Sequence, residues 1–290
     1  MKLTRAERKN AKIKMALQGP SGSGKTYSSL LIAYGLCKDW SKIVVVDTEN
    51  QSSHLYAHLG SYQVLSLEPP FSPERYVKAI ATSVEAGSEI IIIDSISHEW
   101  EGAGGILNIH GSMTGNSFTN WNTVTPRHNN FINAIIQCPI HIISTIRSKQ
   151  DYVLSEKNGK YVPEKVGLKG VTREGVDYEM TLVLELDIKH NTTATKDRTG
   201  LFIDKPSFKI DPSTGEKIKN WCLSGTSLND VISKINSCNN VNDLHELYKQ
   251  YPEYQDELLD AFKQRKLALE SKIEISKPLN IQENGTNGLK

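Results

Sequence analysis

The residues with the clearest chemistry form a phosphate-binding pattern near the amino end of the chain. Residues 19–26 follow the spacing G-x-x-x-x-G-K-[ST]. In such a segment the glycines let the backbone wrap tightly, so that successive N–H groups point at the phosphates of a nucleoside triphosphate. The lysine, Lys25, adds a positive charge, and the hydroxyl of Thr26 binds Mg²⁺. The predicted nucleotide-binding residues are Gly19, Pro20, Ser21, Gly22, Ser23, Gly24, Lys25, Thr26 and Tyr27.

The sequence on either side of this segment supports the same interpretation. A short apolar run at residues 13–17 precedes it, and a helical pattern at residues 26–38 follows it. A strand before and a helix after would place the phosphates at the amino end of a helix, where backbone N–H groups are free. The alternative is a Gly/Ser-rich turn that matches the pattern by accident, and the flanking elements count against it.

A nucleotide site of this kind also needs an acidic residue for Mg²⁺, and two strand ends offer one. Residues 43–46 lead into Asp47 and Glu49, and four isoleucines at residues 90–93 lead into Asp94. If Asp47 held the metal, its strand would adjoin the P-loop strand, as in the kinase and GTPase branch. If Asp94 held it, an extra strand would intervene and Glu49 would be free to polarise the attacking water.

We assign Mg²⁺ to Asp94 and Thr26, and the attacking water to Glu49, because four consecutive isoleucines suit a central strand that is covered on both faces. For Asp94 and for Glu49 the alternative is a helix cap or a turn at a strand end.

The elements that must position these residues follow from short apolar runs and helical spacing. Three helical patterns, at residues 26–38, 73–86 and 125–137, separate the first four predicted strands. This alternation predicts an α/β fold, with a mostly parallel central sheet covered by helices. The five predicted strands are residues 13–17, 43–46, 90–93, 140–145 and 181–186.

Charge and helical spacing divide the rest of the chain. Residues 1–14 hold six Lys or Arg and one Glu, whereas residues 241–260 hold six Asp or Glu and one Lys. Helical patterns after about residue 225 predict a small helical appendage, and the last residues have no periodicity. The predicted regions are a basic arm (residues 1–11), the nucleotide-binding core (12–225), the helical appendage (226–271) and a flexible tail (272–290).

The order of these motifs resembles the RecA-type ATPase core over about residues 12–202. The resemblance rests on the P-loop, on Asp47-Thr48-Glu49, on Asp94-Ser95 and on residues 142–147. Residues 144–149, 152–154 and 175–179 further resemble the RecA-like ATPases of bacteriophages, a group that includes single-strand-annealing and recombination proteins encoded beside phage replication genes. The resemblance implies a RecA-like P-loop NTPase core that uses ATP and Mg²⁺.

The resemblance also implies roles for individual residues. Glu49 would activate the water, and Asp94 would support Mg²⁺. Thr145 falls where relatives place a polar sensor of the γ-phosphate, often a longer Gln. Lys196 and Arg198 fall where the recombinase core carries a basic pair, which in a filament reaches the nucleotide of the neighbouring subunit. The alternative for this pair is a solvated hairpin tip.

Two predicted loops follow the carboxyl ends of the strands, where open α/β folds bind ligands. Residues 100–125 are rich in Gly, Asn, Ser and Thr, and residues 147–174 hold seven basic and four acidic residues. The resemblance implies that both line a DNA channel, where cations meet phosphates and aromatic rings stack on unpaired bases. The alternative for the second is a surface hairpin made basic for solubility. The predicted DNA-binding residues are Arg147, Lys149, Lys157, Lys160, Lys165, Lys169 and Arg173.

The composition of the 290 residues excludes several protein classes. The four cysteines are scattered without a CxxC pair, which argues against a zinc site and a disulfide framework. No apolar run approaches the roughly 18 residues of a membrane span, and no apolar signal segment follows the basic amino end. We therefore expect a cytoplasmic protein without membrane contact. The resemblance to bacteriophage ATPases implies that this cytoplasm is that of a bacterial host cell, if a phage or prophage encodes the chain. The net charge of +1 excludes a uniformly basic coat but leaves local basic segments.

Three functions remain open at this point. The first is an ATPase that binds single-stranded DNA as a homo-oligomeric ring or filament and acts in recombination, annealing or replication. The second is an ATP-dependent oligomeric switch or partner platform, whose acidic appendage contacts a single-strand-binding or replication protein. The third is a P-loop kinase for a small metabolite, for which the sequence shows no lid signature.

Overall fold

The computed structural model describes residues 11–157, 160–223 and 228–275, and for residues 150–157, 160–168, 253 and 272–275 it describes the backbone alone. The described chain forms two compact units, one over residues 11–222 and the other from Leu223 onward. Nearly all of the predicted basic arm, residues 1–10, lies outside the described residues.

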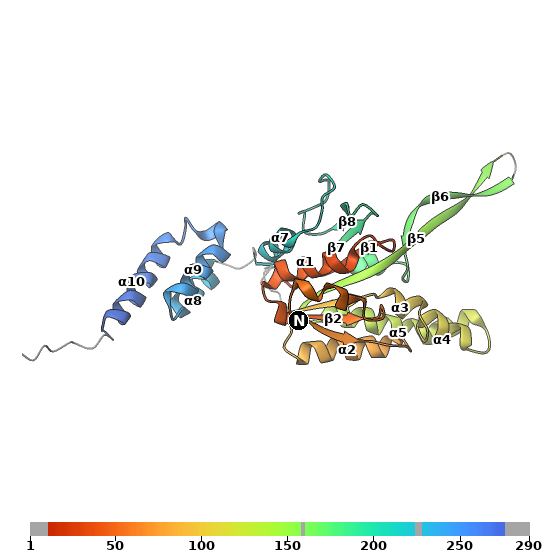
Figure 1. Cartoon of the computed structure of the whole chain (residues 1–290), viewed down its shortest axis with the longest axis horizontal. Helices are drawn as coiled ribbons and strands as arrows, with labels where there is room; N and C mark the ends of the chain where they lie inside the picture. Colours follow the sequence, from red (N-terminus) through yellow and green to blue (C-terminus); the bar gives the residue numbers. More distant parts are fainter. Residues whose placement is uncertain (1–10, 158–159, 224–227, 276–290) are drawn as a thin grey trace, which may run out of the picture. The chain divides into compact units, whose positions relative to one another are not determined.

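The first unit is built on a twisted sheet whose strands follow the order β3-β2-β4-β5-β1-β7-β8 (Figure 1). Neighbouring strands are parallel except at two places, since β8 runs antiparallel to β7, and β6 pairs antiparallel with β5 beyond the main sheet. The predicted α/β class with a mostly parallel sheet is confirmed. The strands are β1 (Lys14–Gly19), β2 (Ile43–Asp47), β3 (Gln63–Ser66), β4 (Ile90–Asp94), β5 (His141–Lys157), β6 (Lys160–Gly170), β7 (Leu182–Leu186) and β8 (Thr192–Asp197).

Helices and short 3₁₀ turns connect these strands. Those of the first unit are α1 (Lys25–Cys37), η1 (Trp40–Lys42), η2 (Ser52–Leu59), α2 (Pro73–Glu85), α3 (Ser97–Glu101), α4 (Ile106–Ser112), α5 (Ser117–Gln137), α6 (Val176–Glu179) and α7 (Pro212–Leu223). In the part of the chain that the structure describes, no helix is both long and apolar enough to cross a membrane.

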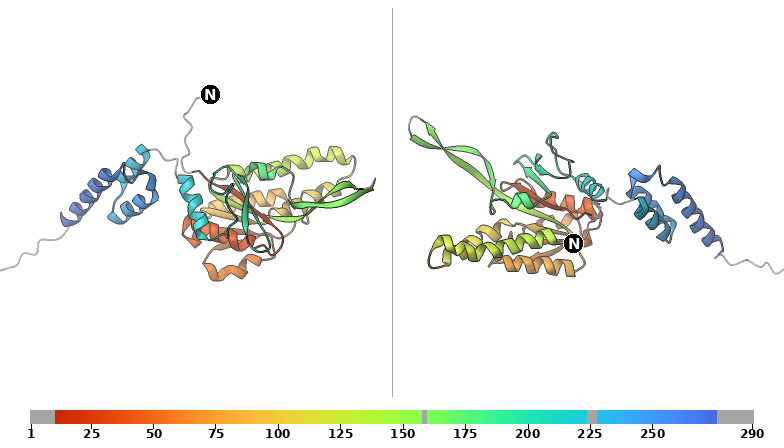
Figure 2. Two further views of the ribbon diagram at one scale, coloured as in Figure 1. Left: turned by 90° about the horizontal axis from the view of Figure 1, so that it is seen from above. Right: turned by 180° about the vertical axis from the view of Figure 1, so that it is seen from behind.

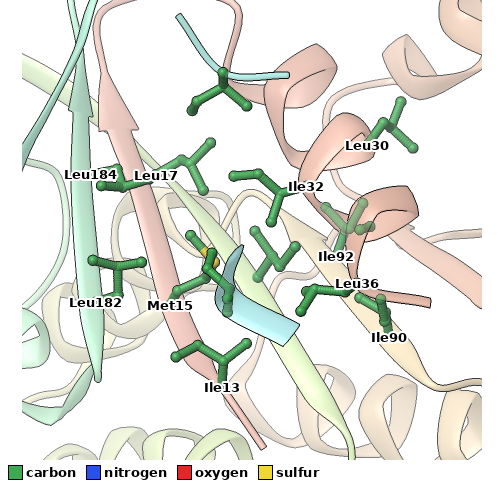
Figure 3. Close-up of a cluster of buried hydrophobic side chains, with 14 of the residues drawn as sticks. Ile13, Met15, Leu17, Leu30, Ile32, Leu36, Ile90, Ile92, Leu182 and Leu184 are labelled. Carbon is green, nitrogen blue, oxygen red and sulfur yellow. The ribbon is translucent and has the colours of Figure 1, made fainter. Parts of the chain in front are cut away.

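Helices cover both faces of the sheet, which explains why its central strands are apolar on both sides. Every residue of β2 and β4 is buried. On one face α1 and α7 pack against β1, β4 and β7, and on the other α2 and α5 pack against β2, β4 and β5 (Figure 2). Figure 3 shows the first cluster, where Met15 and Leu17 of β1 meet Ile32 of α1 and Ile92 of β4. The core therefore holds the carboxyl ends of β1, β2 and β4, and β5 near Thr145, along one edge.

The segment 100–125 is not the loop that its composition suggested, and that prediction is wrong. Most of it is helical, in α3, α4 and the amino-terminal part of α5, from Ser117 to residue 125. The Asn116 side chain caps α5 by accepting a hydrogen bond from the N–H of Phe118 at 2.8 Å. The buried positions of α5 begin only at Val124, so its amino-terminal part is polar and carries no periodic signal that would have revealed a helix.

The basic segment 147–174 is also mostly regular structure rather than an irregular loop. Strand β5 continues past the sheet to Lys157, and β6 returns antiparallel to it, with Lys149 opposite Lys169 and Lys157 opposite Lys160. We call the paired residues 148–157 and 160–170 the hairpin. It corresponds to the alternative of a surface hairpin in its shape, and its basic residues remain candidates for DNA contact.

The second unit is a small helical bundle with its own core. It contains α8 (Leu228–Ser237), α9 (Val241–Gln250), η3 (Pro252–Tyr254) and α10 (Leu259–Ile275). Val231, Ile235, Tyr251 and Phe262 are among the side chains that are buried together. Helix α10 continues four residues into the segment taken from sequence as the tail, and residues 276–290 lie outside the described part of the chain.

A histidine at the start of β5 makes the stability of the first unit sensitive to acid. The N–H of Ile13 donates to Nδ1 of His141 at 3.1 Å. Burial, with Lys12 and Lys14 nearby, lowers the pKa of His141 from 6.5 to about 3. The unfolded chain therefore binds this proton at a higher pH than the folded protein does. The free energy of unfolding is therefore unaffected by this histidine above pH 6.5. It decreases as the pH falls from 6.5 toward 3, by up to about 1.4 kcal/mol per pH unit.

We expect His141→Asn to reduce the slope of unfolding free energy against pH, because the asparagine amide oxygen can accept the same hydrogen bond without titrating. The measurement is the urea unfolding free energy at several pH values between about 7 and 4. The exposed His54 provides the control, and His54→Asn should retain the wild-type slope. An unchanged slope in His141→Asn would contradict the assignment.

Candidate functional site

The phosphate-binding segment has the backbone that its sequence predicts. Strand β1 ends at Gly19, and Gly22 and Gly24 adopt left-handed φ angles of 80° and 85°, which side chains other than glycine rarely allow. A Cβ atom on Gly19 would lie 2.5 Å from the carbonyl oxygen of Leu186. Glycine is therefore required at these places, and the chain turns directly from β1 into α1.

The polar groups of this segment fit a bound polyphosphate. Helix α1 begins at Lys25 without a side-chain cap, so its first N–H groups are free for an anion. Nζ of Lys25 donates to the carbonyl oxygens of Gly19 and Pro20, each at 2.9 Å. Burial lowers the pKa of Lys25, and nearby Asp94 opposes that change. The buried hydroxyl of Ser23 has no protein partner among the described residues.

Asp94 joins three elements at the end of β4. Its Oδ2 accepts a hydrogen bond from the hydroxyl of Thr26 on α1 at 2.6 Å, and its Oδ1 accepts one from the hydroxyl of Thr145 on β5. The carboxyl group is almost fully buried, which raises its pKa. A hydroxyl and a carboxylate side by side at a P-loop are suited to Mg²⁺. The Thr145 hydroxyl therefore contacts this carboxylate, and its role as a sensor of the γ-phosphate stays a prediction.

Asp47 has a different environment from Asp94. Its Oδ1 accepts the N–H of Glu49 at 2.7 Å, and its Oδ2 accepts the N–H of Ser53 at 2.9 Å, so this carboxylate closes the turn after β2. Strand β2 also does not adjoin β1, because β4 and β5 lie between them. Of the two candidates that the sequence left open, the structure brings Asp94 to Thr26.

Glu49 faces the same cavity from the end of β2. Both of its oxygens are paired with the guanidinium of Arg147, with Nε to Oε1 at 2.8 Å and Nη2 to Oε2, and Oε1 also accepts the hydroxyl of Ser95 at 3.0 Å. Burial acts to raise the pKa of Glu49, but Arg147 outweighs it and the pKa is lowered. Glu49 is therefore held as a carboxylate at this site.

These residues surround a cavity of about 910 Å³ at the carboxyl edge of the sheet. The predicted residues that line it are Ser21, Gly22, Gly24, Lys25, Thr26, Tyr27, Glu49, Asp94, Arg147 and Lys149. Sequence reasoning missed others that line it, among them Tyr56, His190 and Lys209. His190, in the turn between β7 and β8, lies with Nδ1 3.0 Å from the carbonyl oxygen of Ser23. No local motif marks these residues, because they reach the cavity only through the fold.

Lys196 and Arg198 do not join this cavity. Lys196 lies opposite Val183 near the start of β7, at the sheet edge away from the P-loop. Nζ of Lys196 donates to the carbonyl oxygen of Asp177 at 2.9 Å, and Nη2 of Arg198 donates to that of Tyr178 at 3.1 Å. They are also not at a hairpin tip, since the turn joins the other ends of β7 and β8. Any contact of this pair with a nucleotide would have to be with another copy of the chain.

The predicted DNA-binding residues separate into groups. Arg147 and Lys149 reach the cavity, where Lys149 pairs with Glu101 at 2.6 Å. Lys157, Lys160 and Lys165 are in the hairpin strands, but their side chains lie outside the described part of the chain. The exposed Lys169 is opposite Lys149.

Arg173 lies apart from the rest of the basic residues. It lines a second cavity, of about 470 Å³, beside His128. His128 is buried and pairs with Glu99 at 3.0 Å, and burial raises the pKa of Glu99. Sequence reasoning did not predict this buried pair, which ties α3 to α5.

Comparison with known protein families shows what the chain is similar to. The model of a family described as "AAA domain" matches residues 11–216, which is more than two thirds of the chain and includes the whole cavity. A search of curated proteins finds no match.

We expect Lys25→Ala to weaken binding of ATP with Mg²⁺ by about 100-fold, because the variant lacks the charge that Lys25 places beside the phosphates. Isothermal calorimetry measures this change. The control is Lys38→Ala at the other end of α1, where Lys38 pairs with Glu216 outside the cavity, and its affinity should equal that of the wild type. Equal affinities for Lys25→Ala and the wild type would remove the P-loop assignment.

Proposed function

The chain belongs to the AAA-domain family, and from this premise we propose that it binds ATP with Mg²⁺ and hydrolyses the γ-phosphate. The contact of the Thr26 hydroxyl with Asp94 at 2.6 Å carries the proposal, because it joins the P-loop helix to the buried acidic strand. Glu49 lines the same cavity, so the groups for metal binding and for water activation converge on one place.

Binding is assigned to the P-loop. Lys25 and the N–H groups at the start of α1 attract the phosphate oxygens, and Thr26 and Asp94 would hold Mg²⁺. The metal would neutralise charge on those oxygens when it is bound. Thr145 keeps Asp94 oriented by its own hydrogen bond to the carboxylate.

Hydrolysis is assigned to Glu49. As a carboxylate it accepts a proton from the attacking water while the water oxygen bonds to the γ-phosphorus. The bond from that phosphorus to the bridging oxygen breaks, and ADP and phosphate leave. A general base of this kind contributes about 10²- to 10⁴-fold to a rate.

We further propose that the protein acts on single-stranded DNA, as a RecA-like ATPase of the bacteriophage type in recombination, annealing or replication. The hairpin supports this proposal. It concentrates lysines on two paired strands, and its base lies at the nucleotide cavity through Lys149. Phosphates of an unpaired strand would compete with Glu101 for Lys149, since an exposed ion pair is worth no more than about 1 kcal/mol.

The position of Lys196 and Arg198 supports an oligomer. They lie at the sheet edge away from the P-loop of their own chain. In a ring or filament, a neighbouring copy could present its cavity to them, and their charges would then stabilise the phosphoryl group there.

A second candidate function is an ATP-dependent platform for a partner protein. The separate helical unit from Leu223 onward favours it, because its residues 241–260 hold six acidic residues and one Lys. A basic partner, or a single-strand-binding or replication protein, would suit this unit.

We expect single-stranded DNA to stimulate ATP hydrolysis and to bind the hairpin. A plot of log affinity against log salt concentration has a negative slope. The double change Lys157→Ala/Lys160→Ala should reduce the magnitude of that slope by about 1.4, because each lysine paired with a phosphate of a single strand contributes about 0.7. Hydrolysis without DNA should not change. The control is Lys263→Ala/Lys266→Ala in α10, for which the slope should equal that of the wild type. The absence of DNA binding at low salt would contradict the DNA proposal and leave the platform function.

We expect Arg198→Ala to hydrolyse ATP slowly and to recover activity when mixed with Lys25→Ala. In the mixture, Lys25→Ala subunits supply Arg198 to intact P-loops of their neighbours. A mixture of Lys25→Ala with Glu49→Gln should stay inactive, because both changes damage the acting subunit's own cavity. The measurement is the steady-state rate against mixing ratio. A rate no higher than the sum of the two separate proteins would contradict action between subunits.

A further inference from the structure

Three polar side chains on one face of β5 each contact an acid at the nucleotide cavity. Thr145, Arg147 and Lys149 are alternate residues, so they point to the same side of the strand. Their partners are Asp94, Glu49 and Glu101, which lie at the ends of β4, β2 and α3. The middle contact joins the carboxylate proposed to activate water to the arginine at the base of the hairpin.

The Arg147–Glu49 pair is well formed but accessible. Two guanidinium nitrogens face two carboxylate oxygens, which is the strongest geometry for such a pair. The side chains are 41% and 21% exposed respectively, and both line the cavity that holds Lys25 and Thr26. Both side chains are therefore accessible to a ligand in this cavity.

The pair opposes the function proposed for Glu49. A carboxylate held through both oxygens by a guanidinium is a weak proton acceptor, because the positive charge stabilises its ionised form. Ser95 holds Oε1 as well. Water activation therefore requires that Arg147 release Glu49.

We propose that Arg147 exchanges partners, holding Glu49 in the resting protein and turning to the γ-phosphate of bound ATP, which releases Glu49 to the attacking water. This inference rests on the proposed ATP hydrolysis and adds a positioning residue to it. A terminal phosphate competes well for a guanidinium, since it carries more charge than a carboxylate and offers oxygens in the same bidentate spacing. ADP lacks that phosphate, so only the triphosphate draws Arg147 away.

The exchange makes the pair a sensor of the third phosphate. One movement would add a cation to the group being transferred and remove a cation from the base. Thr145 does not have to reach the γ-phosphate in this scheme, because its hydroxyl is already bonded to Asp94. The longer arginine two residues further along β5 takes the sensing role that resemblance implied for Thr145.

The test compares the affinities for a non-hydrolysable ATP analogue and for ADP, each with Mg²⁺ and without DNA. For Arg147→Ala we expect the analogue to bind about tenfold or more weakly, with ADP affinity within about twofold of the wild type. For Glu49→Gln we expect the analogue to bind about tenfold more tightly and hydrolysis to fall, because Arg147 no longer has a charged partner to leave. The double variant should lose that gain in affinity.

Two further variants serve as controls. Arg127 forms a comparable bidentate pair with Glu74 away from the cavity, and Arg127→Ala should leave both affinities unchanged. Arg147→Lys keeps the charge without the fork and should bind the analogue with intermediate affinity, which preserves the test if Arg147→Ala does not fold.

Each outcome decides between the exchange and its alternatives. Equal losses for the analogue and ADP would make Arg147 a structural residue. Unchanged affinity of Arg147→Ala for the analogue, or no gain in the affinity of Glu49→Gln for it, would overturn the exchange. A fall in DNA affinity of Arg147→Ala without these changes would mean that Arg147 contacts DNA instead. A wild-type protein that binds and hydrolyses no ATP would overturn the proposed function itself, which separates that failure from failure of the exchange alone.

Discussion

The burial of the Asp94 carboxylate is the constraint on which the site depends. A carboxylate removed from water needs hydrogen bonds to remain in a folded protein. Here they come from Thr26 on α1 and Thr145 on β5, so the P-loop helix and two neighbouring strands must meet at one point. The sheet order β4-β5-β1 satisfies this requirement, because β5 separates the acidic strand from the P-loop strand and carries Thr145 between them. The layered core below holds that edge in place.

The sequence predicted those parts of the site whose signals are local. The P-loop needs glycines at fixed spacing, and the four isoleucines before Asp94 need cover on both faces, so both could be found without coordinates. The Arg147–Glu49 pair could not, because 98 residues separate its members and only the strand order β2-β4-β5 brings them together. The contact of His190 with Ser23 could not be predicted either, since no residue near His190 in the sequence indicates it.

Other differences have local causes. The start of α5 is polar and depends on the cap by Asn116 rather than on buried side chains, so its composition resembled that of a loop. Strand β8 is not among the strands predicted from sequence, because it lies at the sheet edge and carries Thr and Lys with little alternation of apolar and polar residues. The roles of Lys196 and Arg198 came from resemblance, and their distance from the P-loop edge shows why such a role cannot be judged from one chain. The near-neutral net charge likewise conceals basic and acidic segments at different places along the chain.

The continuity of β5 has a mechanical consequence. The same strand that pairs with β1 and β4 inside the core continues through ten more residues, from Ser148 to Lys157, with one shift of its register against β6 after Asp151. At about 3.3 Å per residue, this projecting part is a lever of roughly 33 Å, and a swing of about 10° at its base would move the far end by roughly 6 Å. Arg147 is the last residue of β5 that pairs with β1, so the projecting part begins directly after it. A change of hydrogen-bond partner at Arg147 that leaves the core unaltered would therefore move the far end of the hairpin by about the spacing between successive nucleotides. A force applied at the far end would in turn move the residues at the nucleotide cavity by a much smaller distance.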